Sequence, residues 1–233
     1  MDNLAEGLIY YVVFLFSTTV HEAAHAWQAK RGGDLTAYHG GQVSLDPMPH
    51  IRREPFGMVL LPLLTVFLSG WPFGYASAPY DPQWALRHPR RAAAMAAAGP
   101  ISNFLLALLA ALLIRAGMAA GFFYAPSSIG FGHIAGTDLH GLWPALAFFL
   151  GAMFSMNLLL GAFNLLPLPP LDGSALPLAV LHPANARAYQ NFLWGNPILS
   201  IFGIMIAWKI FTPIFSPIFF GAIALLYPGM GYR

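Results

Sequence analysis

Residues 4–29 read LAEGLIYYVVFLFSTTVHEAAHAWQA, and this stretch decides the fold. As one helix rising 1.5 Å per residue it would extend about 39 Å, which exceeds the roughly 30 Å hydrocarbon core of a bilayer. Residues 8–20 are almost wholly apolar, and His21, Glu22 and His25 follow them within about one helical turn. Ionisable side chains are costly at membrane depth and usually serve a function there. The stretch therefore predicts a membrane-spanning helix that carries a functional site.

The composition of the whole chain predicts an integral membrane protein. Hydrophobic residues make up 58% of the 233 residues, charged residues make up only 9%, and the mean hydropathy is +0.62. A soluble domain has roughly 25% charged residues because its surface faces water, and disordered chains are polar, so both classes are excluded. The net charge of +2 gives no argument for nucleic-acid binding, and the absence of cysteine excludes disulfides and thiolate metal ligands.

Further apolar stretches predict an all-α polytopic membrane protein, a bundle of about five to six transmembrane or re-entrant helices. The stretches are residues 56–71, 91–115, 142–166 and 192–227. The first is short enough to re-enter the membrane, and the last, which prolines interrupt, is one long helix or two short ones. The alternation at residues 73–77 allows a small β-hairpin element. We interpret residues 1–233 as one domain, with a motif-bearing core at about 8–175 and C-terminal helices at about 190–228.

The placement of the basic residues predicts the orientation in the membrane. Seven of the eleven Lys and Arg residues lie between residues 30 and 91, whereas residues 116–141 contain none. By the positive-inside rule, the first two loops face the cytoplasm and the third faces outside. The N-terminus then lies outside, and the first helix and the 142–166 helix both end in the cytoplasmic half. We expect a multi-pass protein of the cell membrane with its active site toward the cytoplasm.

His21-Glu22-Ala23-Ala24-His25 is an HExxH motif on a helix. Positions i and i+4 share a helix face, so both imidazoles can bind one Zn²⁺ while Glu22 lies beside them as a general base. A catalytic zinc site usually takes a third protein ligand. Asp172 is a candidate, because the preceding prolines end the helix near residue 166 and Gly173 permits a tight turn toward the bundle.

Three motifs in this order resemble the site-2 protease family of intramembrane zinc metalloproteases. They are HExxH, then Gly99-Pro100-Ile101-Ser102-Asn103, and then Asn164-Leu165-Leu166-Pro167-Leu168-Pro169-Pro170-Leu171-Asp172-Gly173. The resemblance extends through residues 33–37, 45–51 and 73–79 and covers about residues 8–175. Asp46 departs from the pattern, because Asn is expected before Pro47. The PDZ and CBS modules of some members are not visible, so the resemblance is to a compact form of the family.

The resemblance implies an enzyme with one Zn²⁺ per chain. It implies that His21, His25 and Asp172 are the metal ligands and that Glu22 is the general acid and base. The implied reaction is the hydrolysis of a peptide bond within or near the transmembrane segment of a membrane-anchored protein substrate. The implied partners are therefore a transmembrane protein and the surrounding membrane lipid, and no nucleic acid.

Four further motif residues receive supporting roles from the same resemblance. Asn164 would lie close to the active site and hold the substrate or the oxyanion. Gly99, Pro100 and Asn103 would let the middle helix pack tightly on the helices that carry the metal. Small residues do permit close helix approach, and a buried Asn forms hydrogen bonds across helices, so residue chemistry agrees with the implied structural role.

The same kinds of side chain also occur in a second class of membrane protein, which moves metal ions instead of cleaving peptides. A polytopic divalent-metal transporter or channel would hold ions transiently on intramembrane His, Glu and Asp residues. Transporters usually contain internal repeats, and no repeat is visible in this chain. No pattern in the sequence predicts the identity of the substrate or the oligomeric state.

Overall fold

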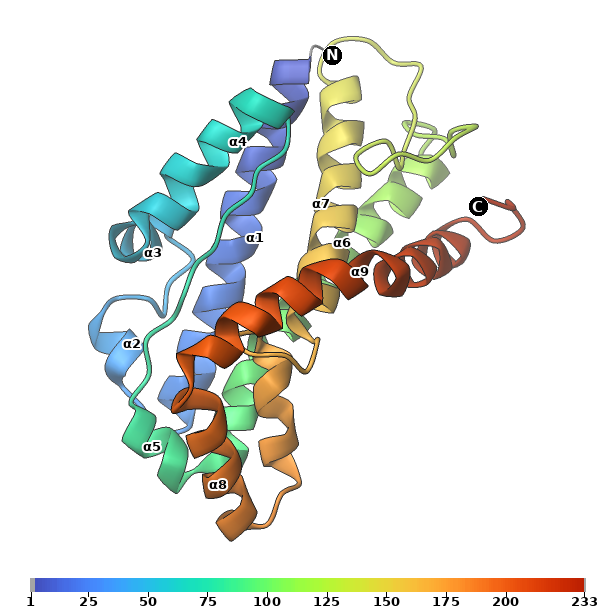
Figure 1. The fold of residues 1–233 in the computed structure, drawn as a ribbon. Coiled ribbons are helices and arrows are strands. Elements are labelled where there is room, and N and C mark those ends of the chain that lie inside the picture. The colour runs from blue at the N-terminus through green and yellow to red at the C-terminus, as the bar shows by residue number, and fades with distance from the viewer. Residues whose placement is uncertain (1–2, 233) are drawn as a thin grey trace.

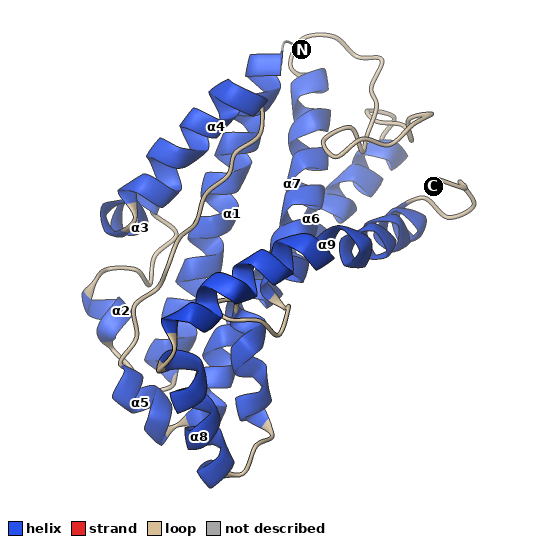
Figure 2. Ribbon diagram, viewed as in Figure 1, coloured by secondary structure: helices blue, strands red, loops and turns tan. Residues whose placement is uncertain are grey.

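The computed structural model describes residues 3–232, and the regular elements in this range are all helical (Figures 1 and 2). Four helices of the described chain are long and apolar enough to cross a membrane. They are α1 (Asn3–Arg31), α6 (Pro89–Ala119), α7 (Trp143–Asn164) and α9 (Pro197–Leu226). A shorter apolar segment consists of η1 (Phe56–Leu60) and α4 (Leu61–Ser69). The prediction of an all-α polytopic membrane protein is confirmed.

Short helices lie between the long ones. They are α2 (Thr36–His39), α3 (Pro47–Arg53), α5 (Pro82–Arg87), η2 (Asp172–Ala179) and α8 (Pro183–Trp194). An aspartate caps the start of both α3 and α5: Asp46 accepts a hydrogen bond from the Met48 N–H (2.9 Å) and Asp81 accepts one from the Gln83 N–H (2.8 Å). Asp caps a helix as well as Asn does, which explains why Asp46 can stand where Asn was expected.

The helices α1, α6 and α7 form the core of the bundle, and η2 packs against α6. The first half of α6 buries small residues, including Ala92, Ala96 and Gly99, so its backbone can approach the neighbouring elements closely. In the most apolar part of α7, 72% of the residues are buried, whereas in that of α9 only 11% are buried. Thus α7 lies at the centre of the bundle, and most side chains of α9 are left to face lipid.

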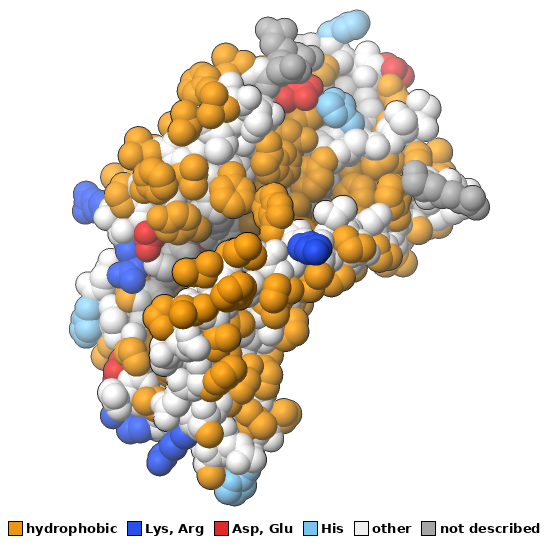
Figure 3. All heavy atoms as spheres, in the orientation of Figure 1, with side chains coloured by type: hydrophobic (Ala, Val, Ile, Leu, Met, Phe, Trp, Pro, Cys, Tyr) orange, Lys and Arg blue, Asp and Glu red, His pale blue; other side chains and the backbone are white. Residues whose placement is uncertain are grey.

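The last long helix, α9, crosses the bundle at a steep angle and is continuous through Pro213 and Pro217 (Figure 1). The prediction left one long or two short helices open, and the structure contains one. On the face drawn in Figure 3, hydrophobic side chains cover α4 and α9, while most of the visible Lys and Arg side chains lie on the side and end of the molecule that carry α3 and α5. This distribution suits a bilayer around the long helices.

The small β-hairpin element is not present in the described residues, and the expectation of one is corrected. Residues 71–80 are extended and run along α1 (Figure 1), but no second strand lies beside them. A Cβ at Gly74 would clash with Phe14 of α1 and Pro62 of α4, so the segment packs closely against both helices. The chain forms one isolated bridge elsewhere, between Tyr124 and Gly136. The alternation of residues 73–77 allows a strand, but a strand also needs a neighbouring segment to pair with.

Candidate metal centre

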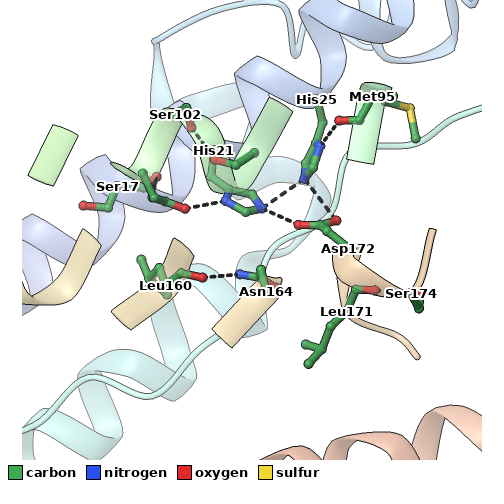
Figure 4. Close-up of polar contacts among 12 residues, drawn as sticks. Ser17, His21, His25, Met95, Ser102, Leu160, Asn164, Leu171, Asp172 and Ser174 are labelled. Carbon is green, nitrogen blue, oxygen red and sulfur yellow. Dashed lines mark hydrogen bonds and ion pairs between the residues drawn. The ribbon is translucent and has the colours of Figure 1, made fainter. Parts of the chain in front are cut away.

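Three side chains from two distant segments meet inside the bundle (Figure 4). His21 and His25 lie one turn apart on α1, and Asp172 is the first residue of η2. The Nε2 atom of His21 lies 3.1 Å from Asp172 Oδ2, and the Nε2 atom of His25 lies 3.3 Å from Asp172 Oδ1. The two Nε2 atoms are 2.9 Å apart. Both histidines are only 7% exposed, whereas the Asp172 side chain is 21% exposed, so the cluster reaches the surroundings on the side of the carboxylate.

The chain reaches this arrangement because α7 ends before Asp172. Pro167, Pro169 and Pro170 cannot continue a regular helix, and the backbone turns back toward the bundle. Gly173 lies so close to the end of α7 that a Cβ there would clash with the backbone of Leu165 and Leu166. The turn therefore brings the carboxylate of the preceding residue to α1, as the sequence predicted.

The Nδ1 atom of each histidine forms a hydrogen bond to an oxygen atom, and that oxygen can only be the acceptor. The Nδ1–H of His25 donates to the backbone carbonyl of Met95 (2.7 Å), and the Nδ1–H of His21 donates to the Oδ1 atom of Asn103 (2.6 Å). A neutral imidazole has one N–H, so with that proton on Nδ1 the Nε2 atom of each histidine carries the lone pair that a metal needs. Two lone pairs and a carboxylate in contact repel one another unless a cation lies among them. Two imidazoles and one carboxylate are the donor set of many catalytic zinc sites, so these residues fit the metal.

Glu22 lies next to His21 on α1, is 6% exposed, and stands outside the three-residue cluster. Among the described residues its carboxylate has no hydrogen-bond or ion-pair partner. A carboxylate that is not held by other groups can exchange a proton with a molecule bound nearby. This position agrees with the place that the HExxH motif predicts for an acid and base.

The Gly99-to-Asn103 motif of α6 lies directly against the histidines. A Cβ at Gly99 would come within 2.5 Å of the Nε2 atom of His21 and would also clash with His25, so only glycine fits there. Pro100 is buried inside α6, and Asn103 is fully buried. The prediction that this motif packs a middle helix against the metal-bearing helix agrees with these contacts. The hydrogen bond from His21 to Asn103 adds a direct link to the cluster.

Asn164 is the last residue of α7, and among the described residues it forms no hydrogen bond with the three clustered side chains. Its Nδ2 atom donates to the carbonyl of Leu160 (3.1 Å), and Figure 4 shows it below the His21–Asp172 pair. The side chain is half-buried. Its predicted role toward substrate stays a prediction.

Two supporting residues were missed by the sequence analysis. Asn157 on α7 is fully buried and donates to Ser17 Oγ and to the Met153 carbonyl, each at 2.9 Å. Tyr189 on α8 donates to the carbonyl of Ser174 (2.7 Å) and so braces η2, and burial raises the pKa of this phenol. A lone Asn inside an apolar span was a usable signal for the first, because buried amides in membranes need partners. No local pattern marks Tyr189.

Comparison with known proteins gives a consistent family. The chain matches the model of peptidase family M50 over residues 9–206. A relative from Bacillus subtilis, the provisionally named zinc metalloprotease YwhC, is 29% identical over 226 residues, covering 89% of this chain and 92% of YwhC. The provisionally named zinc metalloprotease Rip2 of Mycolicibacterium smegmatis is 31% identical over 175 residues, covering 75% of this chain and 58% of Rip2. No solved structure matches.

These comparisons decide between the two classes that the sequence left open. The match to the M50 model covers most of the chain, and both relatives carry the names of zinc metalloproteases rather than of transporters. The four apolar helices place the protein in a membrane, and the His–His–Asp cluster supplies ligands of the kind that zinc takes. The chain therefore belongs to peptidase family M50, the site-2 proteases, and is an intramembrane zinc metalloprotease.

Proposed function

We propose that His21, His25 and Asp172 are the zinc ligands of this protease and that Glu22 is its general acid and base. The observation that carries the proposal is the meeting of two Nε2 lone pairs and one carboxylate within 4.8 Å. When bound, the ion supplies positive charge that polarises the scissile carbonyl and makes water more acidic. The remaining steps belong to side chains of this chain.

Glu22 moves the proton in the proposed reaction. Its carboxylate accepts a proton from the attacking water as the water oxygen bonds to the carbonyl carbon of the substrate. It returns that proton to the amide nitrogen as the C–N bond breaks, so the products are an amine and a carboxylic acid, which then loses its remaining proton to water. The lack of another partner for this carboxylate within residues 3–232 supports the role. Asn164, at the end of α7, is proposed to hold the substrate backbone or its developing oxyanion.

The proposed substrate is the transmembrane segment of a membrane-anchored protein, unwound near the scissile bond. A helix buries its peptide bonds, and a segment that unwinds in a membrane needs new hydrogen-bond partners. Residues 73–80 offer such partners. The Phe73 N–H donates to Thr65 Oγ1 (2.8 Å) and the Tyr75 N–H donates to the Gly57 carbonyl (3.1 Å). In an extended chain the intervening residues point their backbone groups the other way. Among the described residues, Ala76 and Ala78 have no backbone partner there.

Proline substitution tests this docking segment. Ala76→Pro removes the free N–H and is expected to reduce cleavage, whereas Ala76→Val keeps the N–H and favours an extended backbone. Unchanged cleavage by Ala76→Pro, with zinc content retained, would rule out strand addition at this position.

We also propose that the protein lies in the cell membrane with the active site toward the cytoplasm and the N-terminus outside. The concentration of basic residues between positions 30 and 91 supports this orientation. Because the chain has no cysteine, single cysteines introduced at exposed positions between the long helices can report the topology. Gln83→Cys should resist an impermeant thiol reagent in intact cells, and Ser128→Cys should react. The reverse pattern would invert the proposed orientation.

Metal analysis and proteolysis together test the whole assignment. His21→Ala and Asp172→Ala are expected to lose zinc, and Glu22→Gln is expected to keep zinc and lose cleavage of single-span substrates. His39→Ala, at an exposed position on α2, is the matched control and should behave as the wild type. Full zinc occupancy in both ligand variants would overturn the proposed site.

A further inference from the structure

The two histidines differ in how their orientation is held. His25 donates its Nδ1–H to the backbone carbonyl of Met95, and a helical carbonyl cannot turn round. His21 donates to a side-chain amide, that of Asn103. A primary amide can rotate by half a turn and present its NH₂ group instead of its oxygen. The imidazole of His21 would then be driven to the tautomer with its proton on Nε2, which cannot bind a metal.

A second buried amide prevents this rotation. The Nδ2 atom of Asn103 donates to the Oδ1 atom of Asn157 (2.9 Å), with the Ser17 carbonyl a more distant acceptor at 3.5 Å. Asn157 in turn donates from its Nδ2 atom to the Met153 carbonyl and to Ser17 Oγ, each at 2.9 Å. A backbone carbonyl can only accept, so Met153 fixes which end of the Asn157 amide faces it.

Which group donates and which accepts is therefore fixed in each hydrogen bond between the Met153 carbonyl and His21. The Met153 carbonyl orients Asn157, Asn157 orients Asn103, and Asn103 sets the tautomer of His21. Asn157, Asn103 and Ser17 are fully buried, so water does not compete for these groups. We propose that Asn157 is a positioning residue that keeps the lone pair of His21 Nε2 directed at the zinc. This inference rests on the proposed role of His21 as a zinc ligand.

The test first replaces Asn157, and then changes Asn103 so that it can again present only an acceptor to His21. Asn157→Leu keeps a similar volume but removes the acceptor, so the Asn103 amide becomes free to turn. Partners of metal-binding histidines are commonly worth about 10–100-fold in metal affinity, and we expect a loss of that size in zinc competition with a chromophoric chelator. Ser155→Ala is the matched control, because Ser155 is equally buried on α7 and its Oγ has no partner among the described residues.

A carboxylate at position 103 shows whether Asn157 acts by orienting the side chain at position 103 or only by packing in the core. Both oxygens of an aspartate accept, so Asn103→Asp cannot present a donor to His21 whichever way it turns. The double variant N103D/N157L is expected to recover most of the zinc affinity that N157L loses. A role of Asn157 in packing alone would not be rescued by this change. If N157L does not fold, Asn157→Ser replaces it, since serine is too short to reach Asn103.

The outcomes distinguish this inference from the proposed function. Zinc affinity in N157L equal to that of the wild type, or no recovery in N103D/N157L, would overturn the positioning role. His21→Ala is measured in parallel: undiminished zinc affinity in that variant would instead overturn the assignment of His21 as a ligand. Loss of zinc in His21→Ala together with loss in N157L and recovery in the double variant supports both.

Discussion

Replacing Gly99 by alanine is expected to weaken zinc binding while leaving the α6 helix intact. The added Cβ would lie 2.5 Å from His21 Nε2, and ordinary van der Waals contact begins at 3.4 Å. The imidazole or α6 must therefore move by about 0.9 Å, and the clash with His25 acts on the second proposed ligand as well. Metal–ligand distances tolerate only about 0.2 Å of change. We expect a loss of zinc affinity of at least about tenfold.

Stability should change less than zinc affinity. Overpacking a buried site costs about 1–3 kcal/mol, and alanine is preferred to glycine inside a helix by about 1 kcal/mol, so the two effects partly offset each other. The metal-free variant should therefore unfold within about 2 kcal/mol of the metal-free wild type. Zinc competition and thermal unfolding of the purified protein, each with and without metal, measure the two quantities separately.

Gly221→Ala on α9 is the control for this experiment. A Cβ at Gly221 would meet nothing within 4 Å, so the same chemical change creates no clash there. Its zinc affinity and cleavage activity should equal those of the wild type. If Gly99→Ala bound zinc as tightly as Gly221→Ala, the imidazoles would not lie where the structure has them, and the close approach of α6 would not be what makes glycine necessary.

Three other predictions concern the same centre. Glu22→Gln should retain zinc but lower the cleavage rate by about 10²–10⁴-fold, and a smaller loss would show that another group moves the proton. Tyr189→Phe removes the hydrogen bond to the Ser174 carbonyl that braces η2. The Tyr189→Phe variant should have a free energy of unfolding about 1 kcal/mol lower than that of the wild type, measured by denaturant titration. An unchanged value would show that the stability of η2 does not depend on this hydrogen bond. A chelator should lower the melting temperature of the wild type, since a ligand at 100 times its dissociation constant stabilises by about 2.7 kcal/mol, whereas Asp172→Ala should show little chelator effect.

The membrane helices could be predicted because their signal is local. Apolar runs such as residues 8–20 need about 20 residues to cross a bilayer, and composition and length alone identify them. The predicted 142–166 helix is α7, Trp143–Asn164, which ends just before the proline cluster. The extended residues 73–77 were harder, because a strand depends on a neighbouring segment that the alternation does not specify. The structure supplies no such neighbour among residues 3–232.

The candidate site could be predicted in part for the same reason. His21, Glu22 and His25 stand in one motif on one helix face, so their chemistry is visible in a single turn. The closure by Asp172 depends on how a proline-broken turn folds back. The prolines and Gly173 made Asp172 a candidate, and the resemblance to a known family implied that it is the third ligand. Asn157 and Tyr189 act through hydrogen bonds to distant parts of the chain. No spacing rule connects them to the histidines.

The proposed ligands on α1 and η2 lie far apart along the chain, since Asp172 comes 151 positions after His21. Because translation runs from the N-terminus, α1 is synthesised long before η2. A growing chain therefore holds two histidines in the membrane with no third ligand until α6 and α7 have been inserted and the turn after α7 has closed.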